Sequence, residues 1–364
     1  MAFDNRFYTI FYISSFLVFV LFSIIINKLF LTFSKTLGIR ELQRENKEIV
    51  RWASQTKPSL GGLAFYILFL FAIALEAIIH NSVDEGSFLT NEMIGILLSC
   101  TLGFFIGLAD DAYNTNAILK FIGQFLCANI LIVFNVSIEI TPIAAVNYAF
   151  TTFWVIGIMN SINMLDNMDG ISATIATTIL TTILLLLFKT SGLVNSYTII
   201  ILSSIGALLG FLFFNWPPAK IYMGDTGSQF LGILLAGLSI LFLWKFKTGN
   251  QFLQIKQFLI PMLIFIIPII DTTTVFLRRM LKGNSPFIGG KDHLTHHLVY
   301  LGLSEKQTVL FLGSISALSI GISLALLFCF PIWEQAYSFY VLLYFATVFL
   351  IMQWLYNKGS KKLI

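Results

Sequence analysis

The sequence predicts an all-helical membrane protein that crosses the bilayer about eleven times. Hydrophobic residues make up 57% of the 364 positions and charged residues only 11%, which excludes a soluble globular protein. Windows of about 20 apolar residues, the length that spans the hydrocarbon core as a helix, recur along the whole chain. Since no soluble domain or clear internal repeat interrupts this pattern, we interpret residues 1–364 as one integral-membrane domain.

Each expected transmembrane segment is an apolar run bounded by polar or charged residues. In chain order the segments cover residues 8–30, 60–79, 93–109, 118–138, 143–163, 171–188, 196–214, 227–244, 257–277, 308–328 and 337–355. The first run, from Tyr8 to Phe33, exceeds the apolar core of a signal peptide and lacks a small-residue cleavage site, so it is predicted to be a span. The mixed-charge stretch from Ser34 to Ser59 is predicted to be a loop or an amphipathic surface helix.

The distribution of basic residues predicts how the chain is oriented. Short cytoplasmic loops of membrane proteins carry an excess of Lys and Arg. Most of the 22 basic residues fall in one set of alternate loops, so we expect the N-terminus outside and the C-terminus in the cytoplasm. Because the basic residues lie in short loops between the spans, the net charge of +4 does not indicate nucleic acid as a partner, and any anionic partner should be local to those loops. The apolar segments make the lipid bilayer the expected partner.

Five short polar clusters interrupt the apolar sequence, all on the predicted cytoplasmic side. A carboxylate in or beside hydrocarbon is costly, so such residues are functional-site candidates. Their one-sided placement favours an active site facing the cytosol over an ion relay through the membrane mid-plane. The clusters are Asp110-Asp111, Asn160 to Asp169, Met223 to Gly227, Asp271, and His293 to His297.

The first two clusters combine acids with amides. Neighbours on a helix face different directions, so Asp110 and Asp111 are expected to do different jobs, one at a metal or water and one at a proton. An acidic helix end meeting water is the alternative. Asn160, Asn163 and Asp166 recur every three residues and share a helix face, with Asp169 where the helix should break; hydrogen bonding between helices is the alternative for the asparagines.

The remaining clusters surround expected helix ends. Asp225 precedes an apolar helix, where Asp is a preferred N-cap, but a carboxylate beside a phosphate-gathering helix N-terminus also makes sense if a cation bridges them. Asp271 is equally compatible with a packing hydrogen bond and with a site role. His293, His296 and His297 follow a basic stretch, and zinc binding or contacts to phosphate or sugar are both open.

Carboxylates, basic residues and helix N-termini at one membrane face indicate phosphoryl transfer. A hard cation such as Mg²⁺ takes one or two oxygen ligands from the protein and leaves the rest for water and phosphate. The cation and nearby Lys or Arg then neutralise charge at the transferred phosphorus. We therefore expect Asp110, Asn163 and Asp225 to converge from separate helices on one ion, between a soluble phosphate substrate and a lipid substrate.

The motifs, in this order, resemble those of the polyprenyl-phosphate N-acetylhexosamine-1-phosphate transferases. The matching stretches are Lys57 to Gly62, Gly107 to Asp111, Lys120 to Gln124, Asn160 to Gly170, Met223 to Ser228, and Asp292 to Ser304. The resemblance implies transfer of a sugar 1-phosphate from a UDP-N-acetylhexosamine, most closely UDP-N-acetylglucosamine, to undecaprenyl phosphate with release of UMP. It also implies a first step of cell-envelope polysaccharide synthesis at the cytoplasmic face of the inner membrane.

The resemblance also implies roles for single residues. Asp225 and Asn163 would hold Mg²⁺, with Mn²⁺ as an alternative ion, and Asp110 and Asp111 would be the catalytic pair. Substrate contacts are expected from Lys57, Lys120, Asn160, Asp166, Asp169, Arg278, His293, His296 and His297. We predict direct attack of a lipid phosphate oxygen on the β-phosphorus, with a covalent aspartyl-phosphate route as the alternative. The oligomeric state is open, a homodimer included.

Some features depart from the family pattern. The His-His-His-Phe-Glu run of the phospho-N-acetylmuramoyl-pentapeptide branch is absent, Asn167 replaces a common Gly, and the first loop lacks the Arg-Lys-x-His element of the N-acetylglucosamine branch. The exact sugar is therefore open between these branches. An ion-coupled secondary transporter is the rival from another class, but it predicts paired repeats and mid-plane acids, neither of which is evident.

Overall fold

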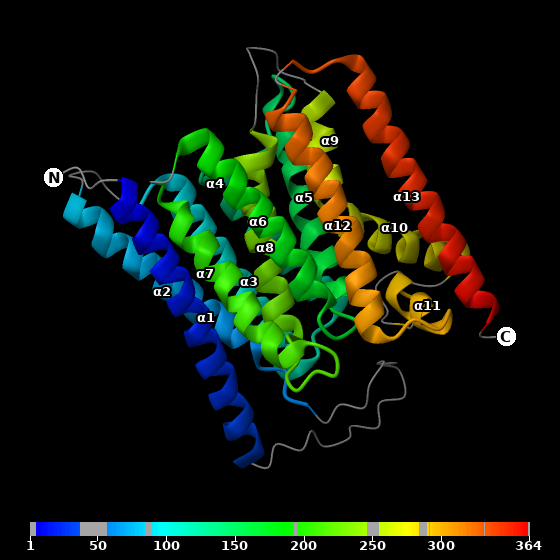
Figure 1. Ribbon diagram of the computed structural model, residues 1–364, viewed down its shortest axis with the longest axis horizontal. Helices are drawn as coiled ribbons and strands as arrows, with labels where there is room; N and C mark the ends of the chain where they lie inside the picture. The colour runs from blue at the N-terminus through cyan, green and yellow to red at the C-terminus, as the bar shows by residue number, and fades with distance from the viewer. Residues whose placement is uncertain are drawn as a thin grey trace.

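The computed structural model describes residues 5–36, 57–83, 89–192, 195–245, 255–283, 290, 292–330 and 332–362. Every regular element in this part of the chain is a helix, which confirms the all-helical prediction (Figure 1). The elements are α1 (Asn5–Thr36), α2 (Gly61–Val83), α3 (Asn91–Tyr113), α4 (Ala117–Val133), α5 (Ala144–Leu165), α6 (Ile171–Ser191), α7 (Tyr197–Asn215), α8 (Gly224–Ser239), the π-helix η1 (Ile240–Trp244), α9 (Ile255–Ile264), α10 (Ile266–Leu281), α11 (Leu294–Tyr300), α12 (Glu305–Phe328) and α13 (Gln335–Lys361). Most of the predicted stretch from Ser34 to Ser59 lies outside the described residues.

Each expected transmembrane segment overlaps a described helix. Eight described spans, one of them α8 continued by η1, are long and apolar enough to cross a membrane, or nine if the α9–α10 pair counts as one span. Of the other two expected segments, α4 has 17 residues and is shorter, and α5, with 22 residues, is not among these spans. The multi-pass character is therefore confirmed, while the count of eleven and the orientation stay predictions.

The segment expected at 257–277 is not a straight helix. Helices α9 and α10 meet at an angle of 83°, and Figure 1 shows α10 lying across the bundle beside α13. Pro261 lies inside α9, and Pro268 follows the break in the first turn of α10. Proline removes a backbone donor and crowds the preceding turn, so two prolines seven residues apart favour a break between them.

Helix α8 forms the centre of the bundle. Nearly every residue of α8 is buried, whereas only 22% of the apolar stretch of α1 and of α13 is buried. Helices α2, α3 and α5 pack against α8 (Figure 1). A polar residue at the start of α8 is therefore surrounded by several other helices.

Two close approaches hold the start of α8. A Cβ added to Gly62 on α2 would overlap the backbone nitrogen of Gly227, and one added to Gly107 on α3 would overlap the carbonyl oxygen of Asp225. The first residue of α2 pairs with the backbone before α8, since Gly61 N donates to Tyr222 O at 3.1 Å. Gly62 and Gly107 thus let α2 and α3 approach α8 more closely than any larger residue allows.

We predict that Gly107→Ala destabilises the protein. The added methyl group has to displace the α8 backbone, and overpacking of this kind costs about 1–3 kcal/mol. The exposed Gly321 on α12 is a matched control, because a Cβ there meets nothing within 4 Å. Thermal unfolding of the purified protein in detergent should show a lower midpoint for Gly107→Ala only; equal midpoints for the two variants would contradict the close approach.

Candidate active site

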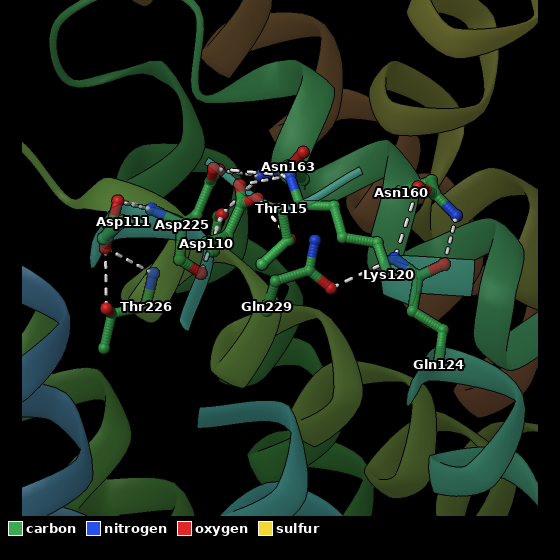
Figure 2. A network of polar contacts seen from close by, with 11 residues as sticks. Asp110, Asp111, Thr115, Lys120, Gln124, Asn160, Asn163, Asp225, Thr226 and Gln229 are labelled. Carbon is green, nitrogen blue, oxygen red and sulfur yellow. Dashed lines mark hydrogen bonds and ion pairs between the residues drawn. The ribbon is translucent and has the colours of Figure 1, made fainter. Parts of the chain in front are cut away.

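Five polar residues from four helices meet at the start of α8 and form what we call the carboxylate cluster: Asp110, Asp111, Lys120, Asn163 and Asp225. Lys120 lies between two of the acids, with Nζ 2.5 Å from Asp110 Oδ2 and 3.3 Å from Asp225 Oδ2 (Figure 2). The two carboxylates thus share the positive charge of the Lys120 ammonium group. The expected convergence of Asp110, Asn163 and Asp225 is present in the structure.

A tight turn between α3 and α4 brings Lys120 back over Asp110. Asn114 ends α3 in the left-handed conformation (φ 49°), which asparagine tolerates better than most residues. Asn116 starts α4, its side chain accepting from Leu119 N at 2.8 Å. Within the turn, Thr115 Oγ1 donates to Asp110 Oδ1 at 2.6 Å. Both oxygens of Asp110 are therefore engaged, one by a hydroxyl group and one by an ammonium.

Asp111 points to different partners from its neighbour, as helix geometry predicted. Its Oδ1 accepts from Asp225 N at 2.9 Å, and its Oδ2 accepts from Thr226 N at 2.8 Å and Thr226 Oγ1 at 2.6 Å. These N–H groups are among those a helix N-terminus leaves unpaired, where the helix dipole also favours an anion. Asp111 thus caps α8 from another helix, and the alternative that Asp225 is the N-cap is wrong.

The left-handed Gly224 (φ 74°) makes room for this contact. A Cβ there would lie 2.8 Å from Asp111 Oδ2, in addition to the strain of a positive φ. Behind Asp225, Asn163 Nδ2 donates to Asp225 Oδ1 and to Ser228 Oγ, the latter at 2.8 Å. The backbone and the side chain of Asp225 are therefore held from opposite sides.

Asp166 and Asp169 follow α5 and differ in their environment. Asp169 Oδ2 accepts from Ala219 N at 2.7 Å, so it fixes the loop that leads into α8. Asp166 is half-buried, and its pKa is raised well above the ordinary value by burial and by the charges of Asp225, Asp111 and Asp169. A carboxyl group in that setting is stabilised in its charged form when a cation arrives.

Two other predicted substrate residues contact side chains outside the carboxylate cluster. Lys57 Nζ lies 5.2 Å from the ring centre of Tyr222, just before α8. Asn160, one turn from Asn163, donates from Nδ2 to Gln124 Oε1 at 2.8 Å. For Asn160 the alternative of hydrogen bonding between helices is therefore what the structure contains.

The histidines belong to a second group, the histidine cluster of Asp271, Asp292, His293, His296 and His297. His293 Nδ1 lies 2.9 Å from Asp271 Oδ2, and Leu294 N donates to Asp271 Oδ1 at 2.8 Å. Asp271 thus makes the packing contact that was one of its two interpretations. All three histidines are buried.

Basic residues and α13 complete the histidine cluster. Arg279 pairs with Asp292 through two hydrogen bonds of 2.7 and 2.6 Å. Arg278 stacks over the Tyr356 ring at 3.9 Å, and Ser360 lies 3.3 Å from His297 Nδ1. His297 of the histidine cluster and the neighbouring Arg278 are therefore held against α13. Neither Arg279 nor Asp292 was among the predicted site residues, although both lie in the basic stretch and the motif around the histidines.

The donor chemistry of the carboxylate cluster fits a hard divalent cation. Among the described residues, no three His, Cys, Asp or Glu side chains converge to hold a metal by themselves, the histidines included. Mg²⁺ needs fewer protein ligands, because it keeps waters and substrate phosphates. Asp225 supplies a carboxylate and Asn163 a side-chain amide beside it. Lys120 between Asp110 and Asp225 shows that the pocket already suits positive charge.

Comparisons with known proteins agree with the motif pattern. A family model described as glycosyl transferase family 4 matches residues 93–243, which contain the carboxylate cluster. A probable undecaprenyl-phosphate N-acetylglucosaminyl 1-phosphate transferase of Bacillus subtilis is 29% identical over 84% of this chain and 82% of its own length. A decaprenyl-phosphate N-acetylglucosaminephosphotransferase of Mycolicibacterium smegmatis is 29% identical over 71% and 69%. A phospho-N-acetylmuramoyl-pentapeptide-transferase of Streptococcus uberis is 28% identical over 81% and 91%.

The cap of α8 predicts a stability difference between two substitutions of Thr226. Thr226→Val removes the hydroxyl donor to Asp111, and hydrogen bonds to charged groups contribute about 1.5–3 kcal/mol. Thr226→Ser keeps the hydroxyl group and serves as the control. Thermal unfolding should show Thr226→Val clearly below Thr226→Ser; the reverse order would mean that Asp111 does not hold α8.

The histidine cluster predicts loss of stability in acid. Burial lowers the pKa of His296 to about 3 and that of His297 to about 4, from 6.5. Below pH 6.5 the unfolded chain therefore binds protons that the folded chain excludes, so stability present above pH 6.5 is lost as the pH falls. At pH 5 the loss is on the order of 2 kcal/mol per histidine. The unfolding temperature should drop from pH 7 to pH 5, and less so in His296→Gln/His297→Gln; an equal drop would refute this origin.

Proposed function

We propose that this chain, which is similar to glycosyl transferase family 4 over residues 93–243, transfers N-acetylglucosamine 1-phosphate from UDP-N-acetylglucosamine to undecaprenyl phosphate and releases UMP. The active site is the carboxylate cluster, facing the cytoplasm at the inner leaflet of the cytoplasmic membrane. The observation that carries the proposal is the position of the Lys120 ammonium group, which lies between the carboxylates of Asp110 and Asp225 at the ends of membrane helices. Such a pocket suits a reaction between two phosphate-bearing substrates, one soluble and one lipid.

The cofactor that suits this pocket is Mg²⁺, held by Asp225 and Asn163 with Asp110 close by. When bound, the ion neutralises negative charge on the reacting phosphates, where phosphoryl transfer gains most of its rate. Mn²⁺ takes similar oxygen ligands and should substitute. Burial and the neighbouring acids raise the pKa of Asp166, so a cation bound beside the substrates would favour its ionised form and be stabilised by it in turn.

Each protein group has a defined task in direct transfer. A lipid phosphate oxygen forms a bond to the β-phosphorus of the donor, and the bond from that phosphorus to the oxygen bridging to the α-phosphate breaks, so UMP leaves with the electron pair. The nucleophile is already mostly ionised at neutral pH, since the second pKa of a phosphate monoester is about 6. Lys120 stabilises charge on the phosphate oxygens, and Asp110 accepts a residual proton. Asp111, engaged by three donors of α8, positions Asp225.

The sugar is N-acetylglucosamine in this proposal. Two of the three relatives above carry N-acetylglucosamine in their names, and the third carries phospho-N-acetylmuramoyl-pentapeptide. The His-His-His-Phe-Glu run of the latter branch is absent from this sequence. A panel of UDP-sugars in the assay below distinguishes the two branches.

We predict that Asp225→Ala abolishes most of the transfer. Membranes containing the protein are incubated with radiolabelled UDP-N-acetylglucosamine, undecaprenyl phosphate and Mg²⁺, and labelled lipid is extracted. Removing the carboxylate should lower the rate by about 100-fold or more, by analogy with loss of one transition-state contact. Glu334→Ala is the matched control, because this exposed carboxylate at the start of α13 makes no side-chain cap contact. Equal amounts of labelled lipid from Asp225→Ala and Glu334→Ala would contradict the proposal. So would a wild-type protein that forms no labelled lipid with any UDP-sugar.

A further inference from the structure

One helical turn deeper than the carboxylate cluster, three amide side chains form an amide layer: Gln124 on α4, Asn160 on α5 and Gln229 on α8. Gln124 is the bridge between the other two (Figure 2). Its Oε1 accepts from Asn160 Nδ2 at 2.8 Å, and its Nε2 lies 3.3 Å from Asn160 Oδ1 and 3.1 Å from Gln229 Oε1. No motif argument assigned a role to Gln124 or Gln229.

Each residue of the amide layer lies about one helical turn from a residue of the carboxylate cluster on the same helix. Gln124 follows Lys120 by four residues, Gln229 follows Asp225 by four, and Asn160 precedes Asn163 by three. Residues at these spacings lie on one helix face, about 4.5–6 Å apart along the axis. Helices α4 and α8 start at the cluster and α5 ends there, so all three amides lie on the same deeper level.

The burial of the layer makes its hydrogen bonds hard to replace. Gln124 is 1% exposed and Gln229 is fully buried, and no water is available in hydrocarbon to satisfy a polar group that loses its partner. Gln229 Nε2 has no hydrogen-bond partner within the part of the chain that the structure describes. An apolar residue at 229 would avoid that cost, so the contact from Gln229 Oε1 to Gln124 is what explains the amide.

We propose that Gln124, Asn160 and Gln229 are positioning residues that fix the rotation of α4, α5 and α8 and thereby align Lys120, Asn163 and Asp225. Rotation of one helix about its axis would break a hydrogen bond in the amide layer and move a side chain of the cluster at the same time. The amide layer therefore couples the register of three helices to the geometry of the cation pocket. This inference rests on the proposed function for its rate measurement but not for its binding measurement.

The test compares Gln124→Leu, Gln229→Leu and the double variant with Gln257→Leu. Gln257 is the matched control, because it is an equally buried glutamine (1% exposed) whose amide donates to Trp244 O, outside the amide layer. The steady-state rate constants of transfer and the dissociation constant of Mn²⁺, from the paramagnetic resonance of the free ion, are measured on the folded, purified protein. A purely structural role lowers the yield or the unfolding temperature but leaves both constants per folded molecule unchanged.

The expected result is a loss of kcat of about 10-fold in Gln124→Leu, with KM for the UDP-sugar within about 2-fold, since misalignment affects the reacting geometry. Mn²⁺ binding should weaken about 5-fold, and the double variant should match the single ones because the residues act as one unit. Equal kcat and equal Mn²⁺ affinity in Gln124→Leu and Gln257→Leu would overturn the inference. A wild type that binds Mn²⁺ but makes no labelled lipid defeats only the proposed function, whereas a wild type that does neither defeats both.

Discussion

The first turn of α8 is held on several sides, and the geometry of the whole carboxylate cluster depends on that constraint. Gly62 and Gly107 allow the backbones of α2 and α3 to touch α8 where any larger residue would collide. Asp111 then accepts three hydrogen bonds from the exposed helix N-terminus. Because the backbone of Asp225 takes part in both contacts, its carboxylate has little freedom left. A functional group aligned before substrate arrives loses little free energy to reorganisation during the reaction.

The same constraint explains why so much charge is tolerated beside hydrocarbon. Asp110, Asp111 and Asp225 each have a hydrogen-bonding or charged partner, and Lys120 links two of them. Buried charges are stable only when paired and hydrogen-bonded. Another cation can nevertheless replace Lys120, since the two carboxylates that share its ammonium group remain able to bind that cation instead. In this view Lys120 holds the pocket together without substrate and faces the phosphates when they bind.

Much of the fold followed from the sequence, because an apolar run of about 20 residues has few alternatives to a membrane helix. The 83° break at α9–α10 was not foreseen, although Pro261 and Pro268 were visible, since a proline does not specify how far the chain bends. The convergence of Asp110, Asn163 and Asp225 could be predicted from motifs. The separate partners of the Asp pair could not, because those of Asp111 lie more than 100 positions away on α8, whereas those of Asp110 lie within ten positions. Likewise, the pattern of three histidines does not reveal that α13, some 60 residues later, helps to bury them.

The most direct test of this account is to locate a divalent ion in crystals of the protein grown with Mn²⁺, by its anomalous scattering. The account predicts one peak at the start of α8, bounded by Asp110, Asn163 and Asp225. A principal peak among the histidines beside Asp271, or an ion bound by acids that do not include Asp225, would contradict it.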